Sequence, residues 1–167
     1  IEAHLATSSE GRAEEIAFYG GTFTAMPTER QLAYLSAAKP YLDSGLIGAV
    51  RISTRPDSLD RVWLKRLRDE FRLRTVELGV QSFNPTVLKA LGRSHGVECV
   101  EDGIGLLKSL GLSVGLHFMI GCPGENGVDD LTLVGRLVAM RSRPKFIRIH
   151  PLLVIAVFTV VFLEIHP

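Results

Sequence analysis

The chain has 167 residues, which is enough for one domain with a buried core. Its formal net charge of +1 gives no general attraction to nucleic acid or to an anionic membrane. The two cysteines, Cys99 and Cys122, provide neither a disulfide framework nor a metal-binding cluster, which favours a reducing, cytoplasmic compartment. The amino terminus lacks the pattern of a signal peptide. The apolar stretch 152–163 is too short to cross a bilayer, so no membrane partner is expected.

Five short apolar segments have the character of buried β-strands, and a helical pattern follows each of the first four. The segments are 15–19, 48–53, 75–80, 113–120 and 146–155, the last of them broken by Pro151. Their centres lie roughly 30 residues apart, the length of a strand–helix unit with its connection. Such alternation predicts a parallel sheet with right-handed crossovers. Periodicity alone does not distinguish an open, doubly wound sheet from a barrel.

Capping residues predict where the helices begin and end. Thr28 with Gln31 has the capping-box pattern, and Ser58 is placed to cap the second helix. Asn84–Pro85 has the N-cap and N1 residues of a third helix, and Gly111 follows the end of a fourth. The apolar residues at helical spacing that we expect to face the core include Leu35, Leu42, Val62, Leu67, Val100, Ile104, Leu137 and Val138.

Polar and glycine residues gather where the predicted strands end. In a parallel sheet these carboxyl ends share one edge, which is where ligands bind in α/β folds. Each residue alone also has a structural explanation: a glycine pair makes a turn, a strand histidine can be a hydrogen-bonded core residue, and Arg93 can stabilise a helix end. The residues expected at this edge are Gly20, Gly21, Thr22, Ser53, Arg55, Gln81, Ser82, His117, Gly121 and His150.

The strand-end segments, taken in order, resemble the radical S-adenosylmethionine superfamily, especially its elongator-like and coproporphyrinogen oxidase-like members. The segments are FYGGTFTAMP, RISTRPDSL, VELGVQSFNPTVLKALGRSH and GLHFMIGCPGE. The resemblance implies a partial (β/α)6 barrel that binds S-adenosylmethionine beside a [4Fe–4S] cluster. It also implies reductive cleavage of S-adenosylmethionine to a 5′-deoxyadenosyl radical, a reductant such as flavodoxin or ferredoxin, and a substrate that in the elongator-like members is tRNA.

The resemblance also implies roles for individual residues. Gly20 and Gly21 match the backbone that receives the methionine amino group, and Thr22 stands where many members have an acid. Ser53 occupies a position that is often glutamate. Gln81 matches a contact to the ribose or the carboxylate, and Arg93 matches the partner of the methionine carboxylate, a role that suits a bidentate guanidinium. His117 matches a position near the ribose, and Gly121 and Pro123 match the loop close to the adenine.

Two features depart from the family pattern. The Cys-x3-Cys-x2-Cys cluster motif and the first strand are absent, so this chain by itself is expected to be inactive, as a fragment of a radical S-adenosylmethionine enzyme. Residues 1–155 are interpreted as the truncated core, incomplete at its amino terminus. Residues 156–167 form an apolar tail unlike the family, for which we prefer a frameshift or truncation.

Two other functions remain open. The first is a paralogue that binds S-adenosylmethionine or a nucleotide without catalysis and without a cluster. The second is a cluster-independent barrel enzyme with His117 or His150 as its acid or base. The basic run 61–74 is a further ambiguity, because a solvated helix face and an RNA-contacting patch both fit its composition.

Overall fold

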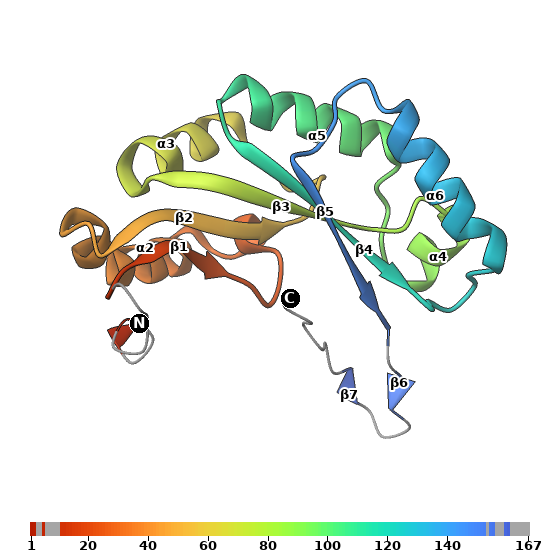
Figure 1. The fold of residues 1–167 in the computed structure, drawn as a ribbon, viewed down its shortest axis with the longest axis horizontal. Coiled ribbons are helices and arrows are strands. Elements are labelled where there is room, and N and C mark those ends of the chain that lie inside the picture. Colours follow the sequence, from red (N-terminus) through yellow and green to blue (C-terminus); the bar gives the residue numbers. More distant parts are fainter. Residues whose placement is uncertain (3–4, 6–10, 153, 156–158, 161–167) are drawn as a thin grey trace.

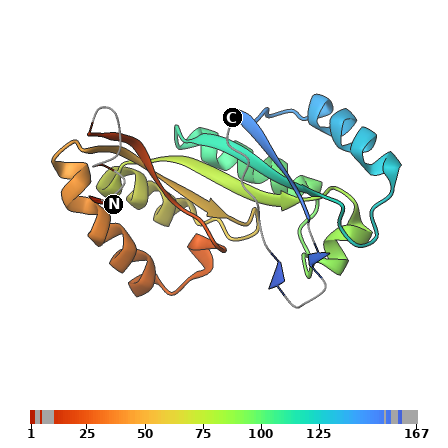
Figure 2. The same cartoon turned by 60° about the horizontal axis from the view of Figure 1, so that its bottom comes forward.

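The computed structural model describes residues 1–2, 5, 11–152, 154–155 and 159–160, and its main feature is a parallel sheet of five strands. The strands lie side by side in chain order: β1 (Ala13–Phe18), β2 (Ile47–Thr54), β3 (Leu73–Gln81), β4 (Ser113–Ile120) and β5 (Phe146–Pro151). A strand order without reversal gives a sheet that curls in one direction, as Figures 1 and 2 show. The predicted partial barrel is confirmed as a curled half-barrel of five parallel strands.

Helices cover the convex side of the sheet and leave its concave side open (Figure 1). They are α2 (Thr28–Asp43), α3 (Arg61–Phe71), α4 (Pro85–Ala90), α5 (Val97–Ser109) and α6 (Gly127–Ala139), with a short 3-10 helix at Phe23–Ala25. The central strand shows the two sides most clearly. Val76, Leu78 and Val80 are buried in the main apolar core, whereas Glu77 and Gly79 line the concave side. This two-residue period is that of an extended strand.

Two of the predicted helix starts are wrong. Pro27, not Thr28, is the N-cap of α2, and no side chain caps it. Gln31 is instead buried, where its amide donates to the Met26 carbonyl at 2.7 Å and accepts from Trp63 Nε1 at 2.7 Å. Helix α3 is capped by Asp60, whose carboxylate accepts from the Trp63 N–H at 2.7 Å, rather than by Ser58. The tertiary contact between Gln31 and Trp63 therefore replaces the predicted capping box at Thr28.

The other helix boundaries agree with the sequence. Asn84 caps α4 by accepting from the Thr86 N–H at 2.8 Å, with Pro85 in the first turn. Gly111 follows α5 with a φ of 72°, as a residue just beyond a helix end should. The expected inward side chains are buried at Leu35, Leu42 and Leu67, but Val62 and Val138 are exposed, so their predicted place in the core is wrong.

The fifth strand is shorter than predicted because it ends at Pro151. Beyond it, β6 (Val154–Ile155) pairs antiparallel with β7 (Thr159–Val160). Apart from Thr159–Val160, the proposed tail 156–167 lies outside the described residues. Within the described part of the chain, every helix is too short or too polar to cross a bilayer.

Candidate functional site

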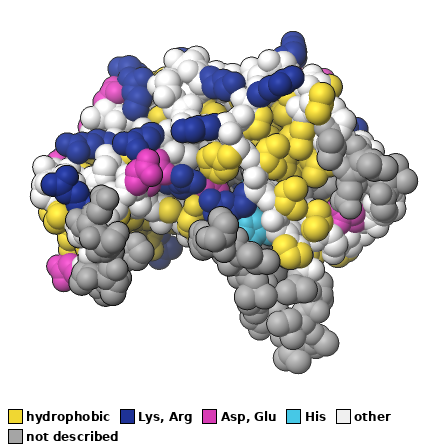
Figure 3. Space-filling view, in the orientation of Figure 1, with side chains coloured by type: hydrophobic (Ala, Val, Ile, Leu, Met, Phe, Trp, Pro, Cys, Tyr) yellow, Lys and Arg dark blue, Asp and Glu magenta, His cyan; other side chains and the backbone are white. Residues whose placement is uncertain are grey.

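A cavity of about 520 Å³ opens on the concave side, at the carboxyl ends of the strands. In Figure 3 arginine or lysine and histidine side chains gather near the hollow on this side of the molecule. The structure brings most of the predicted site residues to the cavity wall: Gly20, Gly21, Thr22, Ser53, Gln81, Arg93 and His117.

Gly121 and Pro123 do not line this cavity. Gly121, with a φ of 77°, lies in the turn after β4, where a side chain would approach the Leu152 carbonyl. Pro123 is exposed in a loop closed by Glu125, whose carboxylate accepts from the Cys122 N–H at 2.8 Å. Their role near an adenine stays a prediction.

Tyr19, Thr54, Glu77, Gly79 and Arg148 also line the cavity, although the sequence reasoning did not assign them to the site. The strand period could have revealed Arg148, because residues 148 and 150 lie on one face of β5 and His150 was already a candidate. Tyr19 directly precedes the predicted Gly20–Gly21 segment, which was also a usable signal.

Arg93 reaches the cavity because of the way helix α4 ends. The Gly92 N–H donates to the Lys89 carbonyl at 3.1 Å, and the Arg93 N–H donates to the Leu88 carbonyl at 2.7 Å. Together with a φ of 65° at Gly92, these two bonds form a Schellman turn, which reverses the chain after the helix. Glycine is favoured there because the left-handed conformation is costly for residues with a Cβ atom.

The guanidinium of Arg93 has hydrogen-bonding capacity that the described residues do not fill. Its Nη1 atom is buried and has no hydrogen-bond partner among the described residues. Burial lowers the pKa of Arg93, and the nearby charge of Arg55 lowers it further, against an opposing effect of Asp57. A buried donor without a partner is costly, so this nitrogen is suited to an acceptor supplied by a ligand.

Arg55 lines the same cavity, but its charge is already balanced. Its Nε donates to Asp57 at 2.8 Å, and its Nη2 contacts the second oxygen of the same carboxylate. This bidentate pair raises the pKa of Arg55 and lowers the pKa of Asp57. Arg55 is therefore held by Asp57 through two of its donors, whereas Arg93 has a buried nitrogen without a partner among the described residues.

The loop after β1 offers backbone rather than side chains to the cavity. Gly20 and Gly21 have φ values of 96° and 153°, and a Cβ atom at either would meet no atom within 4 Å. The absence of side chains leaves this backbone accessible to a ligand. Thr22 and Ser53 add two hydroxyl groups to the same wall.

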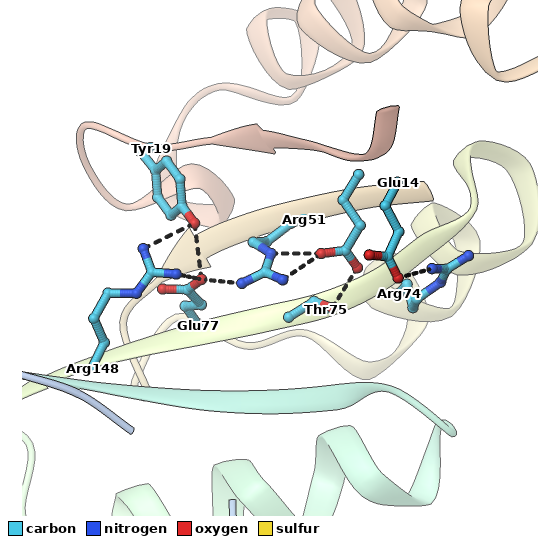
Figure 4. A network of polar contacts seen from close by, with 8 residues as sticks. Glu14, Tyr19, Arg51, Arg74, Thr75, Glu77 and Arg148 are labelled. Atoms are coloured by element: carbon cyan, nitrogen blue, oxygen red, sulfur yellow. Dashed lines mark hydrogen bonds and ion pairs between the residues drawn. The ribbon is translucent and has the colours of Figure 1, made fainter. Parts of the chain in front are cut away.

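A chain of ion pairs runs from the wall of the cavity into the interior of the half-barrel (Figure 4). Glu77, whose side chain is 2% exposed, accepts from Arg51 Nη1 at 2.7 Å and from the Tyr19 hydroxyl at 2.9 Å. Arg51 Nε also donates to Glu15 at 2.7 Å, and Arg148 lies 3.3 Å from Glu77. We call Glu15, Arg51, Glu77, Arg148 and Tyr19 the interior network.

Aromatic packing closes the interior beneath this network. The ring of Phe146 occupies the space where a side chain at Gly115 would lie, since a Cβ there would be 2.3 Å from the ring. Arg51 stacks over the same ring at 5.3 Å from its centroid. Higher up, the rings of His117 and His150 meet edge to face at 4.3 Å between centroids.

The cysteines do not form part of this site. Cys99 is partly buried on α5 and Cys122 is buried in the loop after β4, and both are free thiols. Burial raises the pKa of each thiol, which disfavours the thiolate that binds metals. Among the described residues no three His, Cys, Asp or Glu side chains come together as a metal site.

Several basic residues of the run 61–74 form ion pairs with acidic neighbours. Lys65 pairs with Asp69 and Arg66 pairs with Glu70, each one helical turn apart, and Arg74 lies 3.6 Å from Glu14. These pairs favour the interpretation of a solvated helix face.

Comparison with known proteins agrees with the fold. The chain is 29% identical over 160 residues to a tRNA uridine(34) acetyltransferase of Dehalococcoides mccartyi, a match that covers 84% of this chain and 34% of that protein. A second tRNA uridine(34) acetyltransferase, from Methanocaldococcus infernus, is 35% identical over 108 residues, covering 64% of this chain and 20% of the relative. The chain thus spans about a third or less of these two curated relatives.

Solved structures show the same half-barrel. An amino-terminally deleted Elp3 from Methanocaldococcus infernus superposes with a TM-score of 0.74 at 28% identity, covering 87% of this chain and 38% of that one. Coproporphyrinogen III oxidase (HemN) from Escherichia coli gives 0.63 at 19% identity, covering 88% and 35%, and supports the fold alone. The model of the radical SAM superfamily matches residues 2–134. The chain therefore belongs to the radical SAM superfamily.

Proposed function

We propose that the cavity binds S-adenosylmethionine, with the Arg93 guanidinium receiving the methionine carboxylate. The observation that carries this proposal is the buried Arg93 Nη1, which has no partner among the described residues although it lines a cavity large enough for a nucleoside. A carboxylate supplies the acceptors that a guanidinium requires, and a charge-assisted bond of this kind is strong.

The remaining wall suits the other parts of the same ligand. The open backbone at Gly20, Gly21 and Thr22 provides carbonyl acceptors for an ammonium group, and Ser53 adds a hydroxyl. Gln81, with both a donor and an acceptor, is placed to bind ribose hydroxyls or the carboxylate. His117 borders the cavity on the β4 side, where it contributes to the ribose environment.

The iron–sulfur part of radical SAM chemistry does not fit the residues of this chain. The sequence has two cysteines where the cluster motif needs three, and both have a pKa raised by burial. In this superfamily the cluster supplies the electron that cleaves S-adenosylmethionine. We propose that this chain supplies the cofactor-binding part of such an enzyme and that the cluster ligands lie outside the 167 residues.

A calorimetric titration with two ligands tests the cofactor proposal. We expect S-adenosylmethionine to bind, and Arg93→Ala to weaken binding by about 1.5–3 kcal/mol, the range for a hydrogen bond to a charged group. The second ligand, 5′-methylthioadenosine, lacks the amino acid part, so its affinity should be the same for both proteins. Arg66→Ala, which removes an exposed arginine far from the cavity, is the matched control.

Equal affinities of the wild type and Arg93→Ala for S-adenosylmethionine would show that the carboxylate binds elsewhere. A parallel loss of 5′-methylthioadenosine binding would show that Arg93 supports the whole cavity rather than the carboxylate.

For the full-length protein we propose an activity in tRNA modification, supported by the names of the two curated relatives and by the likeness to Elp3. Liquid chromatography of nucleosides from the tRNA of a deletion strain should show the loss of a modified uridine. Unchanged tRNA in that strain would favour the alternative, a non-catalytic S-adenosylmethionine-binding paralogue. The alternative also predicts that the complete coding sequence contains no Cys-x3-Cys-x2-Cys motif.

A further inference from the structure

The end of β3 leaves regular strand geometry where the sheet meets the cavity. Its pairing with β4 passes from Gly79 opposite His117 to Gln81 opposite Phe118, so that Val80 is an extra residue. Gln81 itself has a φ of 69°, which residues other than glycine rarely adopt. A bulge of this kind redirects a side chain, and such bulges are frequent beside binding sites.

Two hydrogen bonds to one carbonyl hold this unusual backbone. The Ser82 N–H donates to the Val80 carbonyl at 2.9 Å, which makes Gln81 the centre of a γ-turn of the strained, positive-φ kind. His95 Nε2 lies 3.0 Å from the same carbonyl oxygen. A carbonyl oxygen can only accept, so Nε2 carries the proton and donates it.

The γ-turn determines where the Gln81 amide lies. A Cβ atom added to Gly79 would be 3.0 Å from Gln81 Nε2, so the amide occupies space left free by the missing side chain. Gln81 is 7% exposed and lines the cavity. The positive φ at Gln81 sets the direction in which this side chain leaves the backbone.

His95 belongs to the same short segment as Arg93. The Schellman turn at Gly92 returns the chain to the sheet, Arg93 then enters the cavity wall, and His95 is buried at 5% exposure. The second ring nitrogen of His95, Nδ1, has no hydrogen-bond partner among the described residues. The bond to Val80 is therefore the polar contact that orients this ring.

We propose that His95 is a positioning residue that acts through Gln81: its Nε2–H bond to Val80 holds the γ-turn that directs the Gln81 amide at the ribose or carboxylate of the bound cofactor. This inference rests on the proposed function of the cavity. It adds a residue without a direct ligand contact and explains why a strained backbone persists at the end of β3.

A double-mutant cycle on S-adenosylmethionine affinity tests the coupling. We expect His95→Leu, which removes the donor, to weaken binding about tenfold, the loss of one hydrogen bond to the ligand. His95→Gln should restore most of the affinity because its amide nitrogen can take the place of the Nε2 donor. In a Gln81→Ala background, itself weakened to the same extent, His95→Leu should cause no further loss.

Additive losses in the double variant would overturn the proposal, and so would a His95→Gln protein that binds as weakly as His95→Leu. A wild-type chain that fails to bind S-adenosylmethionine would contradict the proposed function. A wild-type chain that binds, with an unchanged His95→Leu variant, would contradict the role of His95 alone.

Nuclear magnetic resonance gives a readout that needs neither a ligand nor a variant. The long-range nitrogen–proton spectrum of the wild type should show His95 protonated at Nε2, and the Ser82 amide should be protected from hydrogen exchange. A proton on Nδ1, or an unprotected Ser82 amide, would show that the hydrogen bonds holding the turn do not form in solution.

Discussion

The interior network and the cavity both contain charged side chains, but they differ in how completely the protein itself pairs those charges. In the network Glu77 is surrounded by donors from three other strands or strand ends, at Tyr19, Arg51 and Arg148. In the cavity Arg93 keeps a buried nitrogen without a partner among the described residues. The strands that carry the network also contribute their carboxyl ends to the cavity wall, whereas Arg93 comes from the segment after α4.

The comparison shows how a structural charge can be told from a binding charge. A buried group whose hydrogen-bonding capacity is filled by the protein stabilises the fold and has little left for a ligand. A buried donor left unfilled reduces the stability of the free protein and gains a partner only on binding. The interior network therefore stabilises the half-barrel, and Arg93 is the arginine that we propose binds a ligand.

The largest effect should come from breaking the interior network at its centre. Glu77→Leu leaves Arg51 and Arg148 without the carboxylate they share, and we expect unfolding to become easier by about 3–5 kcal/mol, the cost of removing one member of a buried pair. Urea denaturation measures this. The control is Glu14→Ala, which removes a carboxylate that is 91% exposed and should leave the urea midpoint unchanged. Equal urea midpoints for the wild type, Glu77→Leu and Glu14→Ala would show that Glu77 stabilises the fold no more than an exposed carboxylate does.

Removing Arg93 should affect ligand binding but not the stability of the free protein. Arg93→Met deletes an unsatisfied buried donor, so the stability of the free chain should stay within about 0.5 kcal/mol of the wild type or increase. The same change should abolish most of the rise in melting temperature that S-adenosylmethionine gives the wild type, because stabilisation by a ligand follows its affinity. A large loss of stability in ligand-free Arg93→Met would place Arg93 with the structural charges.

A smaller effect is expected where the two regions meet. Tyr19 lines the cavity and also donates to Glu77, so Tyr19→Phe removes one hydrogen bond while Arg51 and Arg148 remain. We expect unfolding to become easier by about 0.5–1.5 kcal/mol. The phenol offers a second measurement: burial first, and the Glu77 charge next, raise the pKa of Tyr19, so it should titrate later than free tyrosine in an ultraviolet pH titration. A normal titration would mean that the hydroxyl does not reach Glu77.

The smallest effect concerns pH. Burial lowers the pKa of His95, and the charges of Arg93 and Arg55 lower it further, against opposing effects of the Val80 hydrogen bond and of Asp57. Because the unfolded state then binds the proton more tightly, stability should fall as pH drops below about 6.5. His95→Gln should show a shallower decline between pH 7 and 5, measured by urea denaturation. Asp57, whose pKa is also lowered, adds its own loss only at more acidic pH.

Much of the fold follows from patterns that extend over a few residues. The alternation of apolar strands and amphipathic helices predicted the parallel half-barrel, and Asn84 with Pro85 correctly predicted the start of α4. The prediction of a capping box at Thr28 failed because Gln31 bonds to Trp63, 32 residues away, and no local pattern contains that contact. Asp60 rather than Ser58 caps α3, and its side chain accepts from the N–H of the same Trp63.

The candidate site was also predictable only where local patterns decide it. The sequence predicted which strand ends carry polar groups, and parallel topology brings seven of the nine proposed residues to one cavity. The sequence did not predict that Glu77 would meet Tyr19, 58 residues away, or that Arg148 would approach a residue 129 positions earlier.

The order of the elements, the family and the residue types at the carboxyl edge follow from the sequence, because strand and helix periods and turn residues act locally. Which charges are satisfied depends on the three-dimensional arrangement. Pairing depends on which strands become neighbours and how far each side chain reaches across the concave face. That is why Arg51, Arg55 and Arg93 look alike in the sequence, yet only Arg93 retains a buried nitrogen without a partner among the described residues.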